Sequence, residues 1–219
     1  LECTAMSNKY LGDEFDIHGG GIDLKFPHHD CEIAQAVGYT GKQPAKFWIH
    51  TNMLTLNSKK MSKSLDNNIL PDELFSGKND IFSNSYDPNI VRFFFLQAHY
   101  RSTVDFSNAA LQAAEKGLIR LFSAIKTLHQ LSPKEKSSID ISLFSLKCDE
   151  AMNDDLNTPI VLSHLFDAVK IINSTKEGNY DLTLEDIDKL KQLFNKYVST
   201  IFGLSSSEKE NNLSELDGL

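Results

Sequence analysis

Hydrophobic residues recur at intervals of three and four throughout the second half of the chain. This spacing places them on one face of a helix, so it predicts amphipathic helices whose apolar faces pack together. Four such stretches lie between residues 107 and 204, which is typical of a helical bundle. Their apolar positions are Leu111, Ala114, Leu118, Phe122 and Ile125; Phe144, Cys148 and Met152; Leu162, Leu165, Phe166, Val169 and Ile172; and Ile187, Leu190, Phe194, Tyr197 and Ile201.

Local signals predict where two of these helices begin and where the last one ends. Thr158 followed by Pro159 predicts an N-cap and a proline in the first helical position. Thr183 with Asp186 three residues later resembles a capping box. Gly203 suits the left-handed conformation that commonly terminates a helix.

The first half of the chain has a different pattern, in which short strand-like segments alternate with glycines and one helix. Residues 14–18 predict a strand that leads into the glycines at residues 19–21, where the backbone turns sharply or closely approaches another group. A helix is predicted over residues 27–38 and a second strand over residues 47–56, followed by a polar loop. The chain is therefore expected to combine an α/β part with an all-α part.

Composition and charge exclude several classes of protein. Hydrophobic residues make up 41% of the 219 residues and charged residues 24%, which is ordinary for a globular protein. No run of about 18 apolar residues occurs, so no membrane partner is expected. With 22 Lys and Arg against 30 Asp and Glu, the net charge of −8 excludes binding of nucleic acid through overall basic charge. Three cysteines are too few for a disulfide framework, which favours a cytoplasmic protein.

A first cluster of chemically interesting residues is the segment Lys60-Met61-Ser62-Lys63-Ser64. Two lysines three residues apart, flanked by hydroxyls, are able to place two ammonium groups on one polyphosphate. There they would stabilise the negative charge that develops when pyrophosphate leaves. The alternative interpretation is a solvated basic loop that binds nothing.

A second cluster combines Cys3 with His28, Cys31 and Glu32. His28 and Glu32 are four residues apart and His28 and Cys31 are three apart, so either pair is able to share one face of a helix. Sulfur, imidazole and carboxylate ligands suit zinc, and the spacing leaves either Cys31 or Glu32 as the second ligand from this helix. In the alternative interpretation the cysteines are small buried apolar residues and His28 is a helix N-terminal residue.

His18 precedes the three glycines at the end of a predicted strand, where α/β sheets commonly bind ligands. The glycines would let a flat ligand approach the backbone; the alternative is a structural histidine beside a simple turn. The His-Gly-Gly-Gly sequence also resembles an esterase oxyanion loop, but the Gly-x-Ser-x-Gly segment that an esterase needs is absent.

These motifs follow one another in a specific order along the chain. The segments are ECTAM (2–6), FDIHGGGIDL (15–24), FPHH (26–29), EIAQ (32–35), KMSKSL (60–65), VRFF (91–94), HYRS (99–102) and DLNTP (155–159). Over about residues 1–204, this order resembles the cysteinyl-tRNA synthetase family of class I aminoacyl-tRNA synthetases. The KMSKS segment is typical of class I synthetases in general, whereas the combination of C-x-A-M, H-G-G-G-x-D-L and P-H-H indicates the cysteine enzyme.

The resemblance implies a fold and a division of the chain. Residues 1–64 would form the C-terminal half of a Rossmann-like catalytic domain, 65–106 a stem-contact region, 107–204 a helical bundle that binds tRNA and its anticodon, and 205–219 a flexible tail. The family's His-Ile-Gly-His segment and its fourth zinc ligand do not occur in this sequence and would belong upstream of Leu1. We therefore expect the chain to be the C-terminal part of a longer enzyme and to form no adenylate alone.

The resemblance also implies a metal site. Zinc would be held by Cys3, His28 and Glu32, with Glu32 rather than Cys31 as the second ligand from the helix, and would bind the thiolate of the substrate cysteine. Because zinc prefers a soft thiolate to a hydroxyl, this coordination would distinguish cysteine from serine without an editing site.

ATP, with magnesium, would by the same resemblance bind the segment from Lys60 to Ser64. Within it, Lys63 would contact the nucleotide and Lys60 would assist as the second catalytic lysine. His18 and Asp23 would form the floor of the amino-acid and adenylate pocket.

The implied activity is ATP-dependent ligation of L-cysteine to tRNA(Cys) through a cysteinyl-adenylate, by a monomeric enzyme. One alternative is a related ligase that shares the catalytic domain but joins cysteine to an amino-sugar. Such an enzyme has no need of the helices at residues 107–203, which favour the tRNA enzyme. The other alternative is a non-catalytic module that binds tRNA or zinc.

Overall fold

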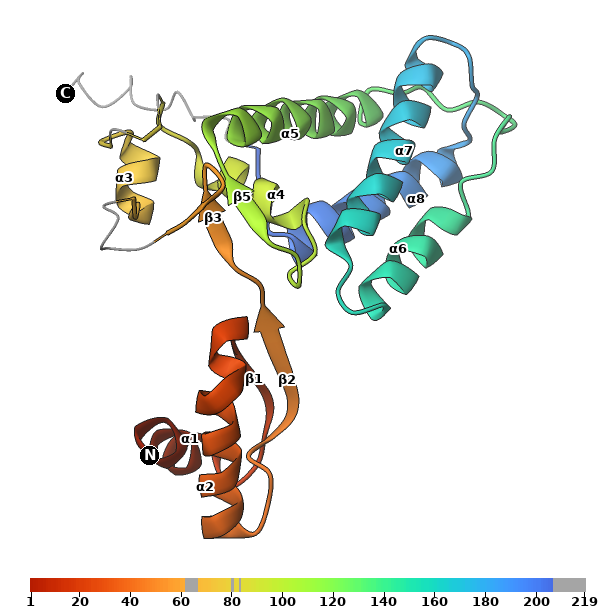
Figure 1. The fold of residues 1–219 in the computed structure, drawn as a ribbon. Helices are drawn as coiled ribbons and strands as arrows, with labels where there is room; N and C mark the ends of the chain where they lie inside the picture. The colour runs from red at the N-terminus through yellow and green to blue at the C-terminus, as the bar shows by residue number, and fades with distance from the viewer. Residues whose placement is uncertain (62–66, 80, 83, 207–219) are drawn as a thin grey trace, which may run out of the picture. The chain divides into compact units, whose positions relative to one another are not determined.

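The structure is a computed structural model that describes residues 1–61, 67–79, 81–82 and 84–206 (Figure 1). Three residues of the predicted nucleotide-binding segment, Ser62, Lys63 and Ser64, lie outside the described residues, as does the predicted tail from residue 207 onward. Among the helices that are described, none is long and apolar enough to cross a membrane.

The chain divides into two compact units. The first consists of Leu1–Leu70 with Ala98–Ser107, and the second of Pro71–Gln97 with the residues from Asn108 onward. Residues 65–106, expected as one stem-contact region, therefore contribute to both units. Their contact with a tRNA stem stays a prediction.

The first unit is built on a parallel pair of strands joined through a helix. In the register of this pair, His18 lies opposite Trp48 and Gly20 lies opposite His50. Parallel strands need a crossover connection, which α2 supplies. The elements are α1 (Glu2–Leu11), β1 (Phe15–Gly21), a 3₁₀ turn (Ile22–Leu24), a π-helical turn (Lys25–His29), α2 (Asp30–Thr40) and β2 (Ala45–Thr51).

Two boundaries in this unit differ from the sequence prediction. The first strand continues through the three glycines, because these pair with residues 49–51 of β2. The regular α-helix begins at Asp30 and not at residue 27, since Phe26 has extended backbone angles and the residues up to His29 form a π-helical turn.

A second, three-stranded sheet follows β2. The predicted single strand over residues 47–56 is interrupted at Asn52. The side-chain oxygen of Asn52 accepts the Met53 N–H at 2.7 Å, and the backbone N–H of Asn52 donates to the Tyr100 carbonyl at 2.9 Å. In the sheet β3 lies in the centre, antiparallel to β4 and parallel to β5. The strands are β3 (Leu54–Leu56), β4 (Lys59–Lys60) and β5 (Val104–Phe106).

The turn between β3 and β4 is anchored by a carboxylate. Asn57 and Ser58 have left-handed backbone angles, with φ of 48° and 61°. The Asp105 carboxylate accepts the Ser58 N–H at 2.6 Å and the Thr55 hydroxyl at 2.7 Å. These hydrogen bonds lower the pKa of Asp105, so the carboxylate that holds the turn stays ionised.

The second unit is helical, as the spacing of apolar residues predicts. Its core contains Leu111, Leu165, Ile172, Leu190 and Tyr197, all fully buried. The helices are α3 (Pro71–Ser76), α4 (Pro88–Leu96), α5 (Asn108–Leu128), α6 (Leu143–Asn153), α7 (Thr158–Lys176) and α8 (Leu184–Phe194), which continues into a π-helical segment (Asn195–Ile201) (Figure 1).

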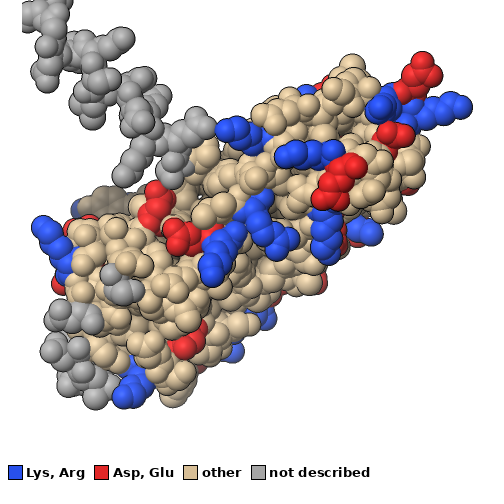
Figure 2. Space-filling view, turned by 90° about the horizontal axis from the view of Figure 1, so that it is seen from above, with Lys and Arg blue, Asp and Glu red and all other residues tan. Residues whose placement is uncertain are grey.

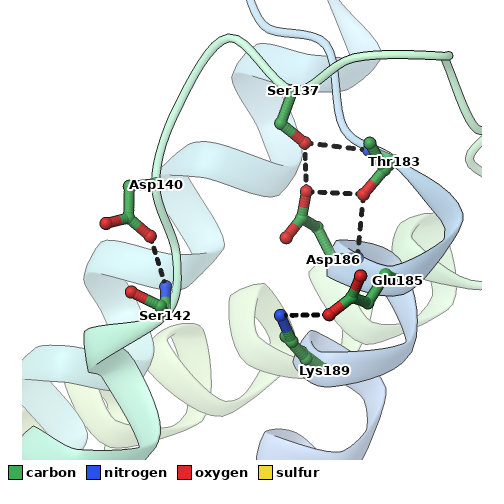
Figure 3. A network of polar contacts seen from close by, with 7 residues as sticks. All are labelled: Ser137, Asp140, Ser142, Thr183, Glu185, Asp186 and Lys189. Carbon is green, nitrogen blue, oxygen red and sulfur yellow. Dashed lines mark hydrogen bonds and ion pairs between the residues drawn. The ribbon is translucent and has the colours of Figure 1, made fainter.

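The predicted start of α8 is confirmed, and the structure adds a further contact. The Thr183 hydroxyl accepts the Asp186 N–H at 3.2 Å and donates to the Asp186 carboxylate at 2.7 Å. Ser137, from the connection before α6, accepts the Thr183 N–H at 3.0 Å and also donates to Asp186 (Figure 3). The helix start is thereby tied to a distant loop.

The predicted start of α7 is wrong by one residue. The N-cap is Asn157, while the Thr158 hydroxyl donates to the Leu96 carbonyl at 2.8 Å. Leu96 ends α4, whose last carbonyls lack partners within that helix, so a contact between helices replaces the local cap. Gly203 has the left-handed φ of 61° expected after the last helix.

Charges of both signs are mixed on the surface. Figure 2 shows Lys and Arg side chains interspersed with Asp and Glu over the face that it presents. Because the chain carries a net charge of −8 and the described residues on this face form no separate basic patch, an anionic partner on it has to be recognised by small local groups.

Candidate functional site

The Glu32 side chain lies at the centre of the candidate site. It projects from the first turn of α2 and is only 7% exposed. Its Oε2 lies 2.7 Å from His18 Nε2 on β1, and its Oε1 lies 2.9 Å from His28 Nε2 in the π-helical turn. Two histidines from different elements therefore approach one buried carboxylate.

Cys3 reaches the same place from α1. The Thr4 hydroxyl of α1 donates to the Gln35 side-chain oxygen of α2 at 2.8 Å, which links the two helices. The ligand atoms of Cys3, His28 and Glu32 all lie within 4.8 Å of one another. Cys31 is exposed and belongs to neither metal-ligating cluster in the described part of the chain. The structure thus brings together the three residues that the resemblance selects.

The chemistry of this cluster fits a metal ion. Glu32 Oε1 is buried and, within the described residues, has no hydrogen bond of good geometry despite its closeness to His28. An acceptor atom in this state costs free energy unless a cation or donor binds it. A thiolate, an imidazole nitrogen and a carboxylate oxygen are ligands that zinc takes in proteins.

A group of aromatic rings lies beside Glu32, formed by His18, His29, Trp48 and His50. His29 is 3% exposed, and its Nδ1 lies 2.8 Å from His50 Nε2 on β2. Burial lowers the pKa of His29, and the neighbouring His18 lowers it further against the opposing effect of Glu32, so the neutral ring is favoured. His18, His29 and Glu32 form a second set of ligand atoms within 4.8 Å of one another.

This group of aromatic rings was not predicted from the sequence. Its members include Trp48, whose ring centroid lies 4.6 Å from that of His18 and 5.0 Å from that of His29. The only signal was the alternation of Trp48 and His50 on a strand, and it becomes informative only once the pairing of β1 with β2 is known.

The glycine run has a role that sequence reasoning left open. A Cβ on Gly20 would lie 2.7 Å from His29 Cε1, closer than protein atoms pack. The close approach at this glycine is therefore made by the His29 ring of the same chain. The backbone is a strand there and not a turn, and Gly21, the last glycine of the run, lines the cavity that also contains Asp23 and Lys60.

The predicted nucleotide-binding residues Asp23, Lys60 and Met61 line one cavity of about 230 Å³ in the first unit. Asn67 donates its side-chain N–H to the Lys60 carbonyl at 3.0 Å, which holds the end of β4. His18, predicted with Asp23 to form the floor of the amino-acid and adenylate pocket, does not line this cavity but contacts Glu32 of the metal cluster; its place in an amino-acid pocket stays a prediction.

Comparisons with known proteins identify the family of the chain. Residues 1–116 match the family model described as "tRNA synthetases class I (C) catalytic domain", and residues 147–206 match the DALR domain. Proteins named cysteine–tRNA ligase are similar to the chain, including those of Bacteroides fragilis (55% identical over 203 residues, 93% of the chain) and Chlorobaculum tepidum (43% over 212 residues, 96% of the chain). The chain spans 41% of the length of each of these two relatives.

A solved structure is similar in fold. The LeuRS–tRNA–LeuAMS ternary complex from Agrobacterium radiobacter K84 aligns with a TM-score of 0.58 at 17% identity, over 88% of this chain and 28% of that one. This likeness concerns the fold alone. Because the catalytic-domain model matches more than half of the residues, the chain belongs to the class I tRNA synthetase (C) family.

Proposed function

We propose that the complete protein ligates L-cysteine to tRNA(Cys), using ATP to form a cysteinyl-adenylate. One observation carries this proposal: Cys3, His28 and Glu32 place a sulfur, a nitrogen and an oxygen ligand within 4.8 Å of one another. The cysteine–tRNA ligase of Bacteroides fragilis, 55% identical over its matched part, supports the same assignment.

Zinc held by these three residues would supply a soft centre that prefers the cysteine thiolate to the hydroxyl of serine. Around it, His18 contacts the Glu32 carboxylate and orients it, as neighbours of metal ligands commonly do. Lys60 and Asp23 line the nearby nucleotide cavity, where the Lys60 ammonium would stabilise negative charge on the phosphates.

The tRNA substrate, in this proposal, contacts the helical second unit. The match of residues 147–206 to the DALR domain supports a role for these helices beyond catalysis. A cysteine:amino-sugar ligase would not need them, and a charging assay with tRNA and with an amino-sugar acceptor separates the two activities.

The metal assignment is tested in the complete protein by measuring zinc content and cysteine-dependent ATP–pyrophosphate exchange together. Glu32→Gln keeps the size of the side chain but removes its charge, and should lower both quantities by at least about tenfold. Cys31→Ser is the matched control, because Cys31 is the adjacent residue and is exposed. Retention of zinc and activity by E32Q, or loss of zinc from C31S, would contradict the assignment.

A further inference from the structure

A second cavity lies in the first unit, and the proposed function does not yet use it. Its volume is about 380 Å³. It shares Ile22 and Asn52 with the cavity that contains Asp23 and Lys60, so ligands in the two cavities would be neighbours. The residues that line it are Ile22, Lys25, Trp48, His50, Asn52 and Arg101.

The lining combines positive charge with an aromatic surface. Lys25 and Arg101 bring two cations to one cavity, although the chain as a whole carries a charge of −8. The rings of Trp48 and His50 are nearly parallel, with an interplanar angle of 9°. Cations beside aromatic rings are the groups with which proteins bind single-stranded nucleic acid, since phosphates meet the cations and bases stack on the rings.

Two details of the hydrogen bonding describe this lining further. Arg101 Nε donates to the Tyr100 hydroxyl at 3.1 Å, and Asn52 donates its side-chain N–H to the Arg101 carbonyl at 2.8 Å, so the arginine is held in place. Trp48 Nε1 is buried and has no hydrogen-bond partner in the part of the chain that is described. A buried N–H of this kind favours a ligand that brings an acceptor atom.

We propose that this cavity binds a nucleotide at the acceptor end of the tRNA, with its phosphate at Lys25 and Arg101 and its base against Trp48. This assignment rests on the proposed function. It names residues that would bind the tRNA in the second step of that reaction, the transfer of cysteine from the adenylate to the RNA. In that step the terminal hydroxyl oxygen of the RNA forms a bond to the aminoacyl carbonyl carbon. The bond from that carbon to the phosphate oxygen breaks, and AMP leaves with its electron pair. The proton of the hydroxyl passes to solvent. The shared wall of the two cavities places the acceptor nucleotide beside the adenylate.

A binding experiment tests the site without catalysis. Trp48 is the single tryptophan of the 219-residue chain and lines this cavity, so its fluorescence reports a ligand that binds there. A single-stranded RNA tetranucleotide should quench the fluorescence of the chain, and Lys25→Gln with Arg101→Gln should weaken binding at least about tenfold. Lys42→Gln is the matched control, since Lys42 is an exposed lysine of the same unit that lines neither cavity. The assignment would be overturned if the RNA left the fluorescence unchanged. It would also be overturned if added ATP displaced the RNA from the cavity.

A kinetic experiment with the complete protein separates this inference from the proposed function. K25Q and R101Q should leave cysteine-dependent ATP–pyrophosphate exchange within about twofold of the parent, while kcat/KM for tRNA charging falls at least about tenfold. If exchange falls as much as charging, the cavity serves ATP or pyrophosphate and the inference is wrong; unchanged charging also refutes it. A parent protein without cysteine-dependent exchange would refute the proposed function instead, and the fluorescence experiment would still decide what the cavity binds.

Discussion

The substitution Gly20→Ala provides a sharp test of how the glycine run supports the site. An added Cβ would lie 2.7 Å from His29 Cε1, 3.0 Å from His29 Nε2 and 3.1 Å from Leu24 Cδ1. The first distance is about 0.7 Å shorter than the 3.4 Å at which ordinary contact begins. His29 is buried and its Nδ1 is hydrogen-bonded to His50 Nε2, so the His29 ring has little room to move away.

The expected cost follows from this crowding. Overpacking a well-packed interior typically costs about 1–3 kcal/mol. Replacing glycine by alanine also removes freedom from the unfolded chain, which returns about 0.4–1 kcal/mol. Gly19→Ala shares this second effect but not the first, because a Cβ on Gly19 would meet only the Ile49 carbonyl oxygen, at 3.7 Å. The difference between the two variants should therefore be about 1–3 kcal/mol.

Urea denaturation followed by Trp48 fluorescence measures this difference directly, because the Trp48 ring lies 5.0 Å from the ring of His29. G20A should unfold at lower urea concentration than G19A. It should also bind zinc more weakly in the complete protein, because His29 follows the ligand His28 in the chain. Equal midpoints for G20A and G19A would show that the His29 ring does not pack on Gly20 as described.

Three further predictions concern parts of the chain away from this contact. Gly203→Ala should lower the free energy of unfolding by about 1–3 kcal/mol, since alanine is strained at φ of 61°; an unchanged urea midpoint would contradict this. Thr183→Ala should cost about 1 kcal/mol in the same measurement by removing the N-cap of α8, whereas Thr183→Ser should keep most of the stability. In the folded protein stripped of metal, iodoacetamide should modify the exposed Cys3 and Cys31, whereas Cys148 should react only after unfolding, because burial raises the pKa of its thiol to about 12; mass spectrometry counts the adducts.

Helices in the second unit were predictable because their signals are local. Apolar residues at helical spacing lie on one face whatever the partner, so the bundle follows from the sequence. Thr183 and Gly203 likewise act on residues within a few positions of themselves. Thr158 shows the limit of this reasoning, because its hydroxyl is used by Leu96, 62 residues away. A contact over that separation leaves no trace in the local pattern.

The candidate site was predictable only in part for the same reason. Spacing along the helix predicted over residues 27–38 allowed either Cys31 or Glu32 to accompany His28, and the choice of Glu32 came from the family resemblance. The contacts among His29, His50 and Trp48 could not be predicted from the sequence, because they depend on the register between β1 and β2.

The parallel pairing of β1 and β2 explains why so much chemistry gathers in one place. Parallel strands end at the same edge, and ligands of α/β sheets bind beyond that edge. The residues after β1 supply Asp23 and Lys25, and the residue after β2 supplies Asn52, so both cavities form where these strands stop. Gly20 lets the His29 ring pack against β1. His29 ends the π-helical turn that leads into α2, and the first turn of α2 carries Glu32. The nucleotide cavity and the proposed acceptor cavity therefore both depend on the same short stretch of backbone pairing, and a slip of one residue in its register would separate the residues that line them.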